Sequence, residues 1–258
     1  MRDVTIRLAV GLAGIITALV VWQLAASVGP LAESPLPSAA AAIEQALALL
    51  GSPEMWSAAG VTLAMAVGGL VIGALLGIAL GIVTGVSPLA QRASRVPLEF
   101  LKPIPPIVIL PIVVLVLGPT AQMGVFLVAF GSIWAIAMQT SAGVYDTDPV
   151  MIATSRSYGL RRGERLRRVV LPSATPYIGT ALRVAAPTAL IIAVVAGLLG
   201  GGPGLGQSLL LAQLSGDQDL LFAYVLILGV LGLLVQSLSR WGERRMLHWH
   251  PQYREVAA

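Results

Sequence analysis

The sequence predicts an all-α membrane protein with about six transmembrane helices and with both termini in the cytoplasm. Of its 258 residues, 57% are hydrophobic and only 11% are charged, and the mean hydropathy is +0.87. Roughly a quarter of the residues in soluble domains are charged, so water is not the main solvent of this chain. Several apolar runs reach the roughly 20 residues that a helix needs to cross a bilayer core, where backbone polar groups must pair within the chain.

Six apolar runs are separated by charged, proline-rich or glycine-rich segments. The first follows Arg2 and Arg7 and also resembles a secretory signal, but its apolar stretch is longer than a usual signal core, which favours an uncleaved anchor. The third is short and rich in proline, and each proline removes a backbone donor, so these prolines must lie at a helix start or be sheltered by other helices. The predicted spans are residues 8–28, 60–86, 104–118, 121–143, 180–200 and 219–240.

The distribution of charge sets the orientation of these spans, because cytoplasmic loops collect Lys and Arg. With the N-terminus inside, all 16 basic residues fall in inside segments, and the outside segments carry only acidic charges. The net charge of +4 therefore indicates membrane topology and not a nucleic-acid partner. A five-span arrangement would move one basic cluster to the outside. The inside clusters are Arg2 and Arg7; Arg92, Arg95 and Lys102; Arg156 to Arg183; and Arg240, Arg244, Arg245 and Arg254.

Two features between the first and third spans predict local structure. The outside segment begins with prolines and becomes rich in Ala and Leu from Ser38 to Leu50, which predicts a short helix on the outer surface. In the second span glycine recurs every fourth residue, and this spacing places a bare stripe on one helical face. The stripe favours close packing against another helix, with helix sliding during transport as the alternative. Its members are Gly69, Gly73, Gly77, Gly81 and Gly85.

Several kinds of chemistry are excluded or disfavoured by composition. The chain has no cysteine, and its two histidines, His248 and His250, lie near the C-terminus, which removes most metal sites. Residues 201–208 have the glycine spacing of a phosphate-binding P-loop, but Gln207 stands where that loop needs lysine, and the segment is on the predicted outer side. We therefore expect that this chain does not bind ATP. A glycine-rich re-entrant turn near a transport pathway is the functional alternative.

The inside loop at residues 143–178 is too long and polar for a simple connector. It contains Asp146, Asp148 and Pro149, then a helical stretch, then Gly159, and then a basic run. Anchoring by positive charge would account for the arginines but not for the spacing. Nine residues separate Gly159 from Val169, and Leu171 and Pro172 follow one residue later.

This spacing is similar to the cytoplasmic loop signature of binding-protein-dependent ABC importer permeases, which begins Glu-Ala-Ala, three residues, Gly. The resemblance covers roughly residues 55–240 and points to the subgroup that imports nitrate, sulfonates and taurine. Ala153, Thr154 and Ser155 occupy the Glu-Ala-Ala positions, so the signature glutamate is missing. The other segments that carry the resemblance are Lys102 to Pro106 with Leu110 and Pro111, Gly118, Gly143 with Asp148 and Pro149, and Leu199, Gly200, Gly204, Leu205 and Gly206.

The resemblance implies a type I ABC importer permease fold in the cytoplasmic (inner) membrane of a prokaryote. It implies residues 1–58 as anchor helix and external segment, 59–245 as permease domain and 246–258 as cytoplasmic tail. Implied partners are a cytoplasmic ABC ATPase dimer that binds ATP and Mg, a second permease of the same or a paralogous chain, an extracytoplasmic substrate-binding protein and the bilayer. The implied ATPase-coupling residues are Ala153, Thr154, Ser155, Arg156, Tyr158, Gly159, Leu160, Arg161, Leu171 and Pro172.

The substrate is expected to pass between two permeases, along polar residues of the spans. Small anions are expected from the subgroup, and a neutral or heterocyclic nutrient such as a vitamin precursor is the alternative. No buried Arg or Lys is expected to offer a fixed countercharge. The candidate pathway residues, for which core packing is the competing explanation, are Thr62, Ser132, Gln139, Thr140 and Ser141.

Three other functional classes compete with an importer. A secondary transporter usually needs carboxylates or histidines within the membrane, and no Asp, Glu or His falls inside a predicted span beyond Asp219, which stands at the start of the last one. An intramembrane enzyme needs a nucleophile, an acid–base pair or a metal-ligand set, and none occurs in the predicted spans. A membrane scaffold remains open because the coupling glutamate is absent.

Overall fold

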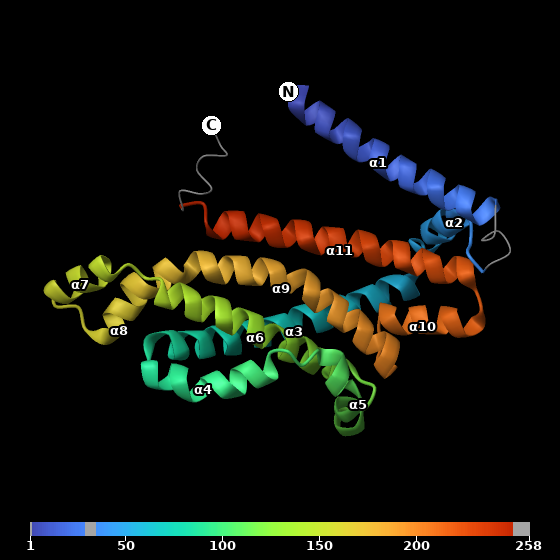
Figure 1. The fold of residues 1–258 in the computed structure, drawn as a ribbon. Helices are drawn as coiled ribbons and strands as arrows, with labels where there is room; N and C mark the ends of the chain where they lie inside the picture. The colour runs from blue at the N-terminus through green and yellow to red at the C-terminus, as the bar shows by residue number, and fades with distance from the viewer. Residues whose placement is uncertain (1, 29–34, 250–258) are drawn as a thin grey trace.

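The computed structural model describes residues 2–28 and 35–249, and in these ranges it consists of helices, turns and bends without strands (Figure 1). The predicted tail lies largely outside the described residues. In chain order the elements are α1 (Arg2–Ser27), α2 (Ala39–Leu49), α3 (Pro53–Val86), α4 (Pro88–Leu101), α5 (Pro106–Leu117), α6 (Ala121–Tyr145), α7 (Pro149–Ser157), α8 (Arg162–Arg165), the π-helical turn η1 (Leu166–Val170), α9 (Leu171–Gly200), α10 (Leu205–Ser215) and α11 (Gln218–Met246).

Five described helices, α1, α3, α6, α9 and α11, are long and apolar enough to cross a membrane. They confirm five of the predicted spans, although α3 and α9 begin well before the apolar runs at residues 60 and 180. The predicted outer helix is also confirmed as α2, with the Ser38 side chain accepting a hydrogen bond from the Ala41 N–H at 3.1 Å. Such N-caps satisfy backbone donors that have no partner in the first turn.

The third span differs from the predicted run at residues 104–118. Helix α5 has only 12 residues, which is about 18 Å of helix and too short for a bilayer core of about 30 Å. The chain instead uses α4 and α5 together, bent by 86° at the break between them. The physical reason is the density of proline, because Pro103, Pro105 and Pro106 remove three backbone donors within four residues, and Pro106 starts the new helix.

Helices α3 and α6 form the tightest contact of the bundle. Each glycine of the predicted stripe faces the next residue of a matching stripe on α6: Gly69 faces Val128, Gly77 faces Ile136 and Gly85 faces Val144. Close packing of the stripe is therefore confirmed. Along these pairs the residue numbers increase in the same direction on both helices, so α3 and α6 run parallel. The broken span α4–α5 must therefore return the chain to the other side of the membrane before α6 begins. The structure thus supports six crossings.

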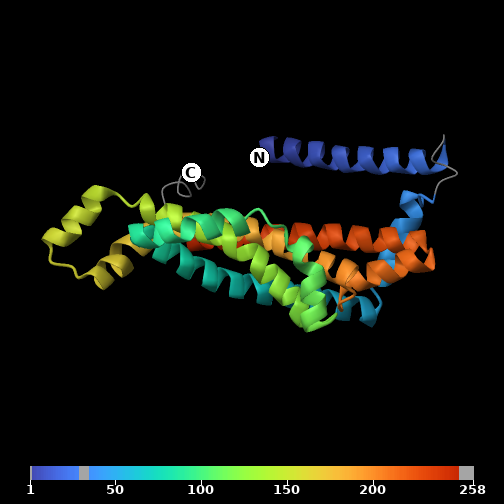
Figure 2. The same cartoon turned by 60° about the horizontal axis from the view of Figure 1, so that its bottom comes forward.

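Helix α9 packs antiparallel to α6, and α11 packs antiparallel to α9 (Figure 2). Small residues make this possible, since Ala181 and Ala185 of α9 lie against Ile136 of α6. Helix α10 returns beside α9, where Gly206 lies directly against the backbone of Val194. The core therefore consists of α3, α6 and α9, and the remaining helices surround it.

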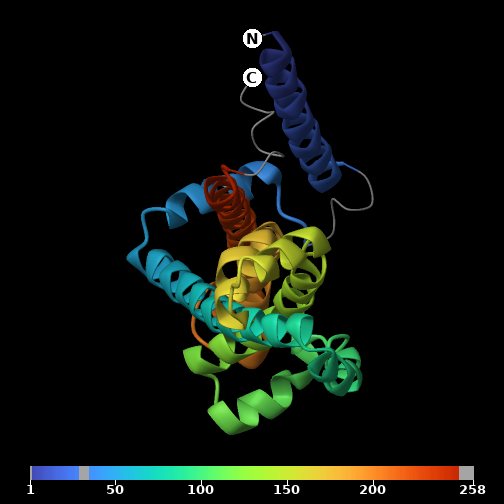
Figure 3. The same ribbon diagram turned by 90° about the vertical axis from the view of Figure 1, so that its left-hand side faces the viewer.

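Helix α1 stands apart from this bundle in every view, and Figure 3 shows it leaning away from α11. It is joined near its C-terminal end, where the Trp22 ring packs against Phe222 with centroids 5.7 Å apart and its Nε1 donates to the Pro37 carbonyl at 3.0 Å. Its exposed apolar side chains, such as Ile15 and Val21, suit a helix surrounded by lipid. The start of α1 and the end of α11 lie on the same side, as expected for two inside termini.

Candidate functional site

The predicted coupling loop forms a helical hairpin that projects beyond the end of the bundle (Figure 1). Helix α7 follows α6 after a short link, and α8, η1 and α9 lead back into the bundle without a break. The link is fixed to α9 because the Tyr177 hydroxyl donates a hydrogen bond to the Asp146 carboxylate at 2.6 Å. Below it, Val170 and Ala174 pack against Val144 of α6. The hairpin is thus rooted in two spans at once.

The two ends of α7 are defined by specific caps. At its start the Asp148 carboxylate accepts the Val150 N–H at 2.7 Å, and Pro149 occupies the first helical turn. At its end the Gly159 N–H donates to the Arg156 carbonyl at 2.9 Å, and the Leu160 N–H donates to the Ser155 carbonyl at 3.1 Å. This pair of bonds is a Schellman motif, which requires a left-handed residue after the helix. Gly159 supplies it with a φ of +74°.

Helix α8 begins where the Glu164 carboxylate accepts the backbone N–H of Arg161 at 3.0 Å. Pro172 lies in the first turn of α9, directly after the π-helical turn η1 (Leu166–Val170), and it removes one backbone donor from this continuous helix. The chain enters α9 through the π-helical turn η1, which was not predicted from the sequence. Such turns are rare and often occur at functional sites.

Most predicted coupling residues are exposed at the tip of this hairpin, including Ala153, Thr154, Arg156, Gly159 and Arg161. The large ring of Tyr158 is 81% exposed, which is unusual for an aromatic side chain in an isolated chain.

Three other predicted coupling residues are less exposed. Ser155 is buried, and its hydroxyl donates to the Ile152 carbonyl at 2.7 Å, so its side chain is not part of the exposed surface. Leu160 and Leu171 are half-buried.

The arginines of α7 and α8 form no ion pair within the described ranges, 2–28 and 35–249. Their charges are therefore available to an acidic partner surface.

Three predicted pathway residues lie between helices rather than on an open surface. Thr62 is fully buried, and its hydroxyl donates to the Ala58 carbonyl at 3.0 Å and accepts the Leu205 N–H at 2.9 Å. Thr140 is fully buried against Gly81, and Ser141 is half-buried with its carbonyl beside Gly85. Their positions agree with the packing explanation that the sequence left open.

The other two pathway candidates, Ser132 and Gln139, line a cavity of about 400 Å³ beside α6 and α9. Gln139 is exposed there, whereas Ser132 is buried and also faces Gly73 of α3. Lys102, at the break between α4 and α5, lines the same cavity, although the sequence analysis assigned it only to an inside loop. Thr180 and Thr188 of α9 were also missed, and their spacing of two helical turns could have pointed to a shared face. The remaining lining residues are Gly131, Ala135, Met138, Ala142, Ala181, Val184 and Ala185.

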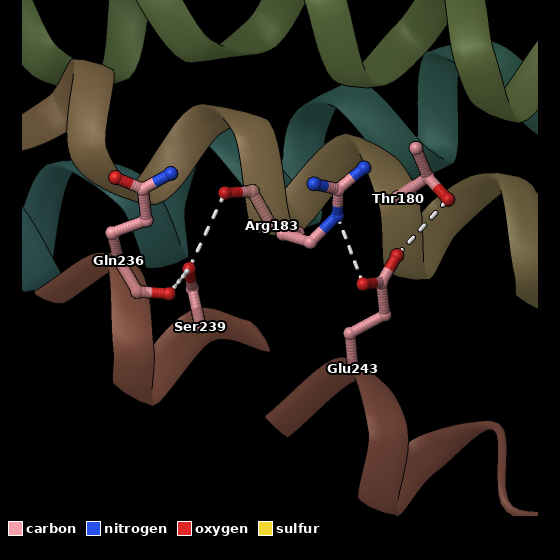
Figure 4. A network of polar contacts seen from close by, with 5 residues as sticks. All are labelled: Thr180, Arg183, Gln236, Ser239 and Glu243. Carbon is pink, nitrogen blue, oxygen red and sulfur yellow. Dashed lines mark hydrogen bonds and ion pairs between the residues drawn. The ribbon is translucent and has the colours of Figure 1, made fainter. Parts of the chain in front are cut away.

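A charged pair joins α9 to α11, contrary to the expectation that the spans hold no acidic residue (Figure 4). Arg183 Nε lies 2.9 Å from a carboxylate oxygen of Glu243, whose side chain is only 7% exposed. The Thr180 hydroxyl donates to the other carboxylate oxygen at 3.1 Å. Arg183 was assigned to the inside loop and Glu243 to the region after the last span, but both helices continue past their apolar runs. The buried carboxylate is tolerated because it is paired.

The comparison of sequences decides what kind of protein carries this architecture. Residues 73–248 match the family described as binding-protein-dependent transport system inner membrane component. The chain belongs to this family. It is therefore a multi-pass permease subunit of an ABC importer and not an enzyme, and ATP hydrolysis is carried out by the ATPase that such a permease works with.

Curated relatives of this permease cover most of its length. It is 30% identical to the putative aliphatic sulfonates transport permease SsuC of Escherichia coli, over 90% of this chain and 89% of the relative. It is 27% identical to the taurine transport system permease TauC of Escherichia coli, over 90% of this chain and 86% of the relative. It is 29% identical to the nitrate import permease NrtB of Leptolyngbya laminosa, over 66% of this chain and 61% of the relative.

Solved structures confirm the type I importer permease fold. A chain of the MetNI methionine ABC transporter matches 76% of this permease and 99% of its own length with a TM-score of 0.67 and 21% identity. A chain of a bacterial ABC transporter for alginate matches 93% of this permease and 97% of its own length with a TM-score of 0.65 and 14% identity. At these identities the likeness concerns the fold alone.

Proposed function

We propose that this permease forms the membrane pathway for a small organic sulfonate, taurine, nitrate or a similar anion. The solute is delivered by an extracytoplasmic substrate-binding protein, and transport is coupled to a cytoplasmic ATPase dimer that binds ATP and Mg. A second permease, either a copy of this chain or a paralogue, completes the pathway in the inner membrane of a prokaryote. The names of the sulfonate, taurine and nitrate relatives favour this substrate class over a neutral nutrient.

The observation that carries the coupling role is the hairpin of α7 and α8. It presents a mostly exposed ring, Tyr158, and exposed arginines at its tip, and it is rooted in α6 and α9 by packing and by the hydrogen bond between Tyr177 and Asp146. A partner that grips the tip can therefore move two spans together. An ATPase that closes on ATP would supply such a movement.

The missing signature glutamate changes the expected contact. Ala153 stands at that position and is exposed, so it offers the ATPase no charge. The neighbouring exposed arginines, Arg156 and Arg161, carry the opposite charge. We therefore expect the groove of the partner ATPase to offer acidic side chains or carbonyl oxygens, together with an apolar surface for Tyr158.

The test is reconstitution with the ATPase and the binding protein from the same organism. Wild-type permease should copurify with the ATPase, and the complex should hydrolyse ATP faster with loaded binding protein. Gly159→Val should uncouple the two activities, because a β-branched residue cannot adopt the φ of +74° without strain.

The matched control is Gly163→Val, four residues away in α8, where an added Cβ also meets no neighbour but the backbone is ordinary. Normal uptake in Gly159→Val would contradict the coupling role of the hairpin. Failure of the wild-type permease to bind the ATPase would contradict the proposed function as a whole.

A further inference from the structure

We propose that Lys102 binds the acidic group of the transported anion in the cavity between the α4–α5 break, α6 and α9, with Gln139 and Ser132 as hydrogen-bonding partners. This inference rests on the proposed function and assigns the countercharge that the sequence analysis did not find.

The cavity has the size and wall expected of a transient site for a small solute. Its volume is about 400 Å³, which is room for about 13 water molecules at about 30 Å³ each. Its wall on α6 and α9 is built largely from small side chains, Gly131, Ala135, Ala142, Ala181 and Ala185. Gly131, Ala181 and Ala185 also pack against neighbouring side chains, so the open part of this wall is formed by Ala135 and Ala142, which are exposed.

The cavity lies along the bundle and not in the loop beyond it. Gln139 precedes the end of α6 at Tyr145 by six residues, and Ser132 precedes it by 13, which places the two side chains about 9 Å and 20 Å from that end. Lys102 lines the same cavity from the break after α4, and its side chain is exposed in the single chain. An ionisable side chain within the membrane-spanning part of a protein is costly and usually functional.

Lys102 is the only charged residue that lines this cavity, and within residues 2–28 and 35–249 no carboxylate pairs with it. Two basic residues of α9 and α4 differ from Lys102, because each has a carboxylate partner. Arg183 is paired with Glu243 at 2.9 Å, and Arg95 is paired with Glu99 at 2.9 Å. No carboxylate among the described residues therefore competes with a solute for Lys102.

The polar side chains that line the cavity with Lys102 differ in whether they can donate a hydrogen bond to a solute. The Thr180 hydroxyl donates to Glu243, and the Thr188 hydroxyl donates to the Val184 carbonyl. Neither hydroxyl proton is available to a solute, so both threonines contribute only to the shape of the cavity. Gln139 and Ser132 make no side-chain hydrogen bond in the described part of the chain. An ammonium, an amide and a hydroxyl together can serve the oxygens of a sulfonate or a nitrate.

The first test uses the absence of native cysteine, which makes an introduced cysteine the only one of this chain, so labelling is read on the permease band alone. Gln139→Cys is placed in the assembled complex in native membranes and treated with two thiosulfonate reagents of similar size, one carrying ethylsulfonate and one carrying ethyltrimethylammonium. With Lys102 present the sulfonate reagent is attracted and the ammonium reagent repelled. In the Lys102→Gln background the ratio of the two reaction rates should fall by at least about threefold, as expected when one nearby charge is removed.

Two controls make this result specific. Lys102→Arg keeps the charge and should keep the ratio. Ser215→Cys, exposed at the outer end of α10, should show a ratio that does not depend on Lys102. An unchanged ratio at Gln139→Cys after Lys102→Gln would overturn the inference, whatever the ATPase does.

The second test measures uptake of taurine and ethanesulfonate by the reconstituted importer. Lys102→Gln should reduce uptake at least about tenfold while the ATPase still copurifies, and Lys102→Arg should retain most of it. Normal uptake by Lys102→Gln would overturn the role of Lys102 and leave the proposed function standing. Loss of ATPase binding by the wild-type chain would overturn the proposed function, and the reagent ratio would still decide the role of Lys102.

Discussion

Replacing one glycine of the α3 stripe with alanine should weaken the bundle, whereas replacing its neighbour should not. A Cβ at Gly69 would lie 2.4 Å from Val128 Cβ and 2.7 Å from the Val125 carbonyl oxygen. Carbon atoms in contact prefer about 3.5–4.0 Å. Gly68 is adjacent but faces away from this contact, and its added Cβ would meet Val125 Cγ2 at 3.7 Å, an ordinary distance.

The magnitude follows from the geometry of the parallel pair. The nearest obstacles are a branched Cβ and a backbone oxygen, neither of which can rotate away, so α3 and α6 must separate by about 1 Å. Separation at Gly69 also loosens the contacts of Gly73 with Ser132. Overpacking of this kind costs about 1–3 kcal/mol. We expect Gly69→Ala to lose about 2–3 kcal/mol and Gly68→Ala to change stability by less than about 0.5 kcal/mol.

The assay is reversible unfolding of the purified permease in mixed micelles with increasing dodecyl sulfate, followed by far-ultraviolet circular dichroism. Both variants add the same methyl group and the same helix propensity, so their difference isolates the contact with α6. Equal stability of Gly69→Ala, Gly68→Ala and wild type would refute the close parallel packing of α3 and α6.

Three further predictions concern other contacts. Arg183→Met should lower the free energy of unfolding by about 3–5 kcal/mol because it leaves Glu243 buried without its charge partner. Combining Arg183→Met with Glu243→Met should restore most of this loss. Equal losses in the single and the double variant would contradict the prediction. Thr62→Val should cost about 1–3 kcal/mol because the Leu205 N–H loses its acceptor, whereas Thr17→Val, on lipid-exposed α1, should cost little. Tyr158→Asp should reduce copurification of the ATPase without changing permease stability, and undiminished copurification would remove Tyr158 from the contact.

The sequence was sufficient to predict features that depend on a repeated pattern or on the conformation of a few neighbouring residues. Apolar length predicted five of the spans that the structure contains, the glycine spacing predicted a packed face, and the helical stretch predicted before Gly159 is α7. The sequence could not show that the partner of the glycine stripe is α6, because parallel packing depends on how α4 and α5 return the chain.

The predictions differed most from the structure in the positions that they gave to charged residues. The rule that Lys and Arg gather inside assigns residues to loops, yet Arg183 lies 12 residues beyond the start of α9 and pairs with Glu243 on α11. A buried pair between distant helices leaves no local pattern, because each partner alone looks like a loop charge. Lys102 was misjudged for the same reason, since the break at Pro103 and Pro105 places it beside the cavity and not beyond the bundle.

The same two helices carry both the hairpin and the cavity, and this gives the proposed mechanism its physical connection. Helix α6 is fixed to α3 by the glycine contacts, and α9 is fixed to α11 by the pair of Arg183 and Glu243. Lys102 follows α4, which has no buried residue. A movement of the hairpin by the ATPase should therefore move α6 and α9 as a unit relative to α4. This movement would change the distance between Lys102 and Gln139. The affinity of the cavity for an anion would then differ between the two states of the importer, which is the condition for coupling.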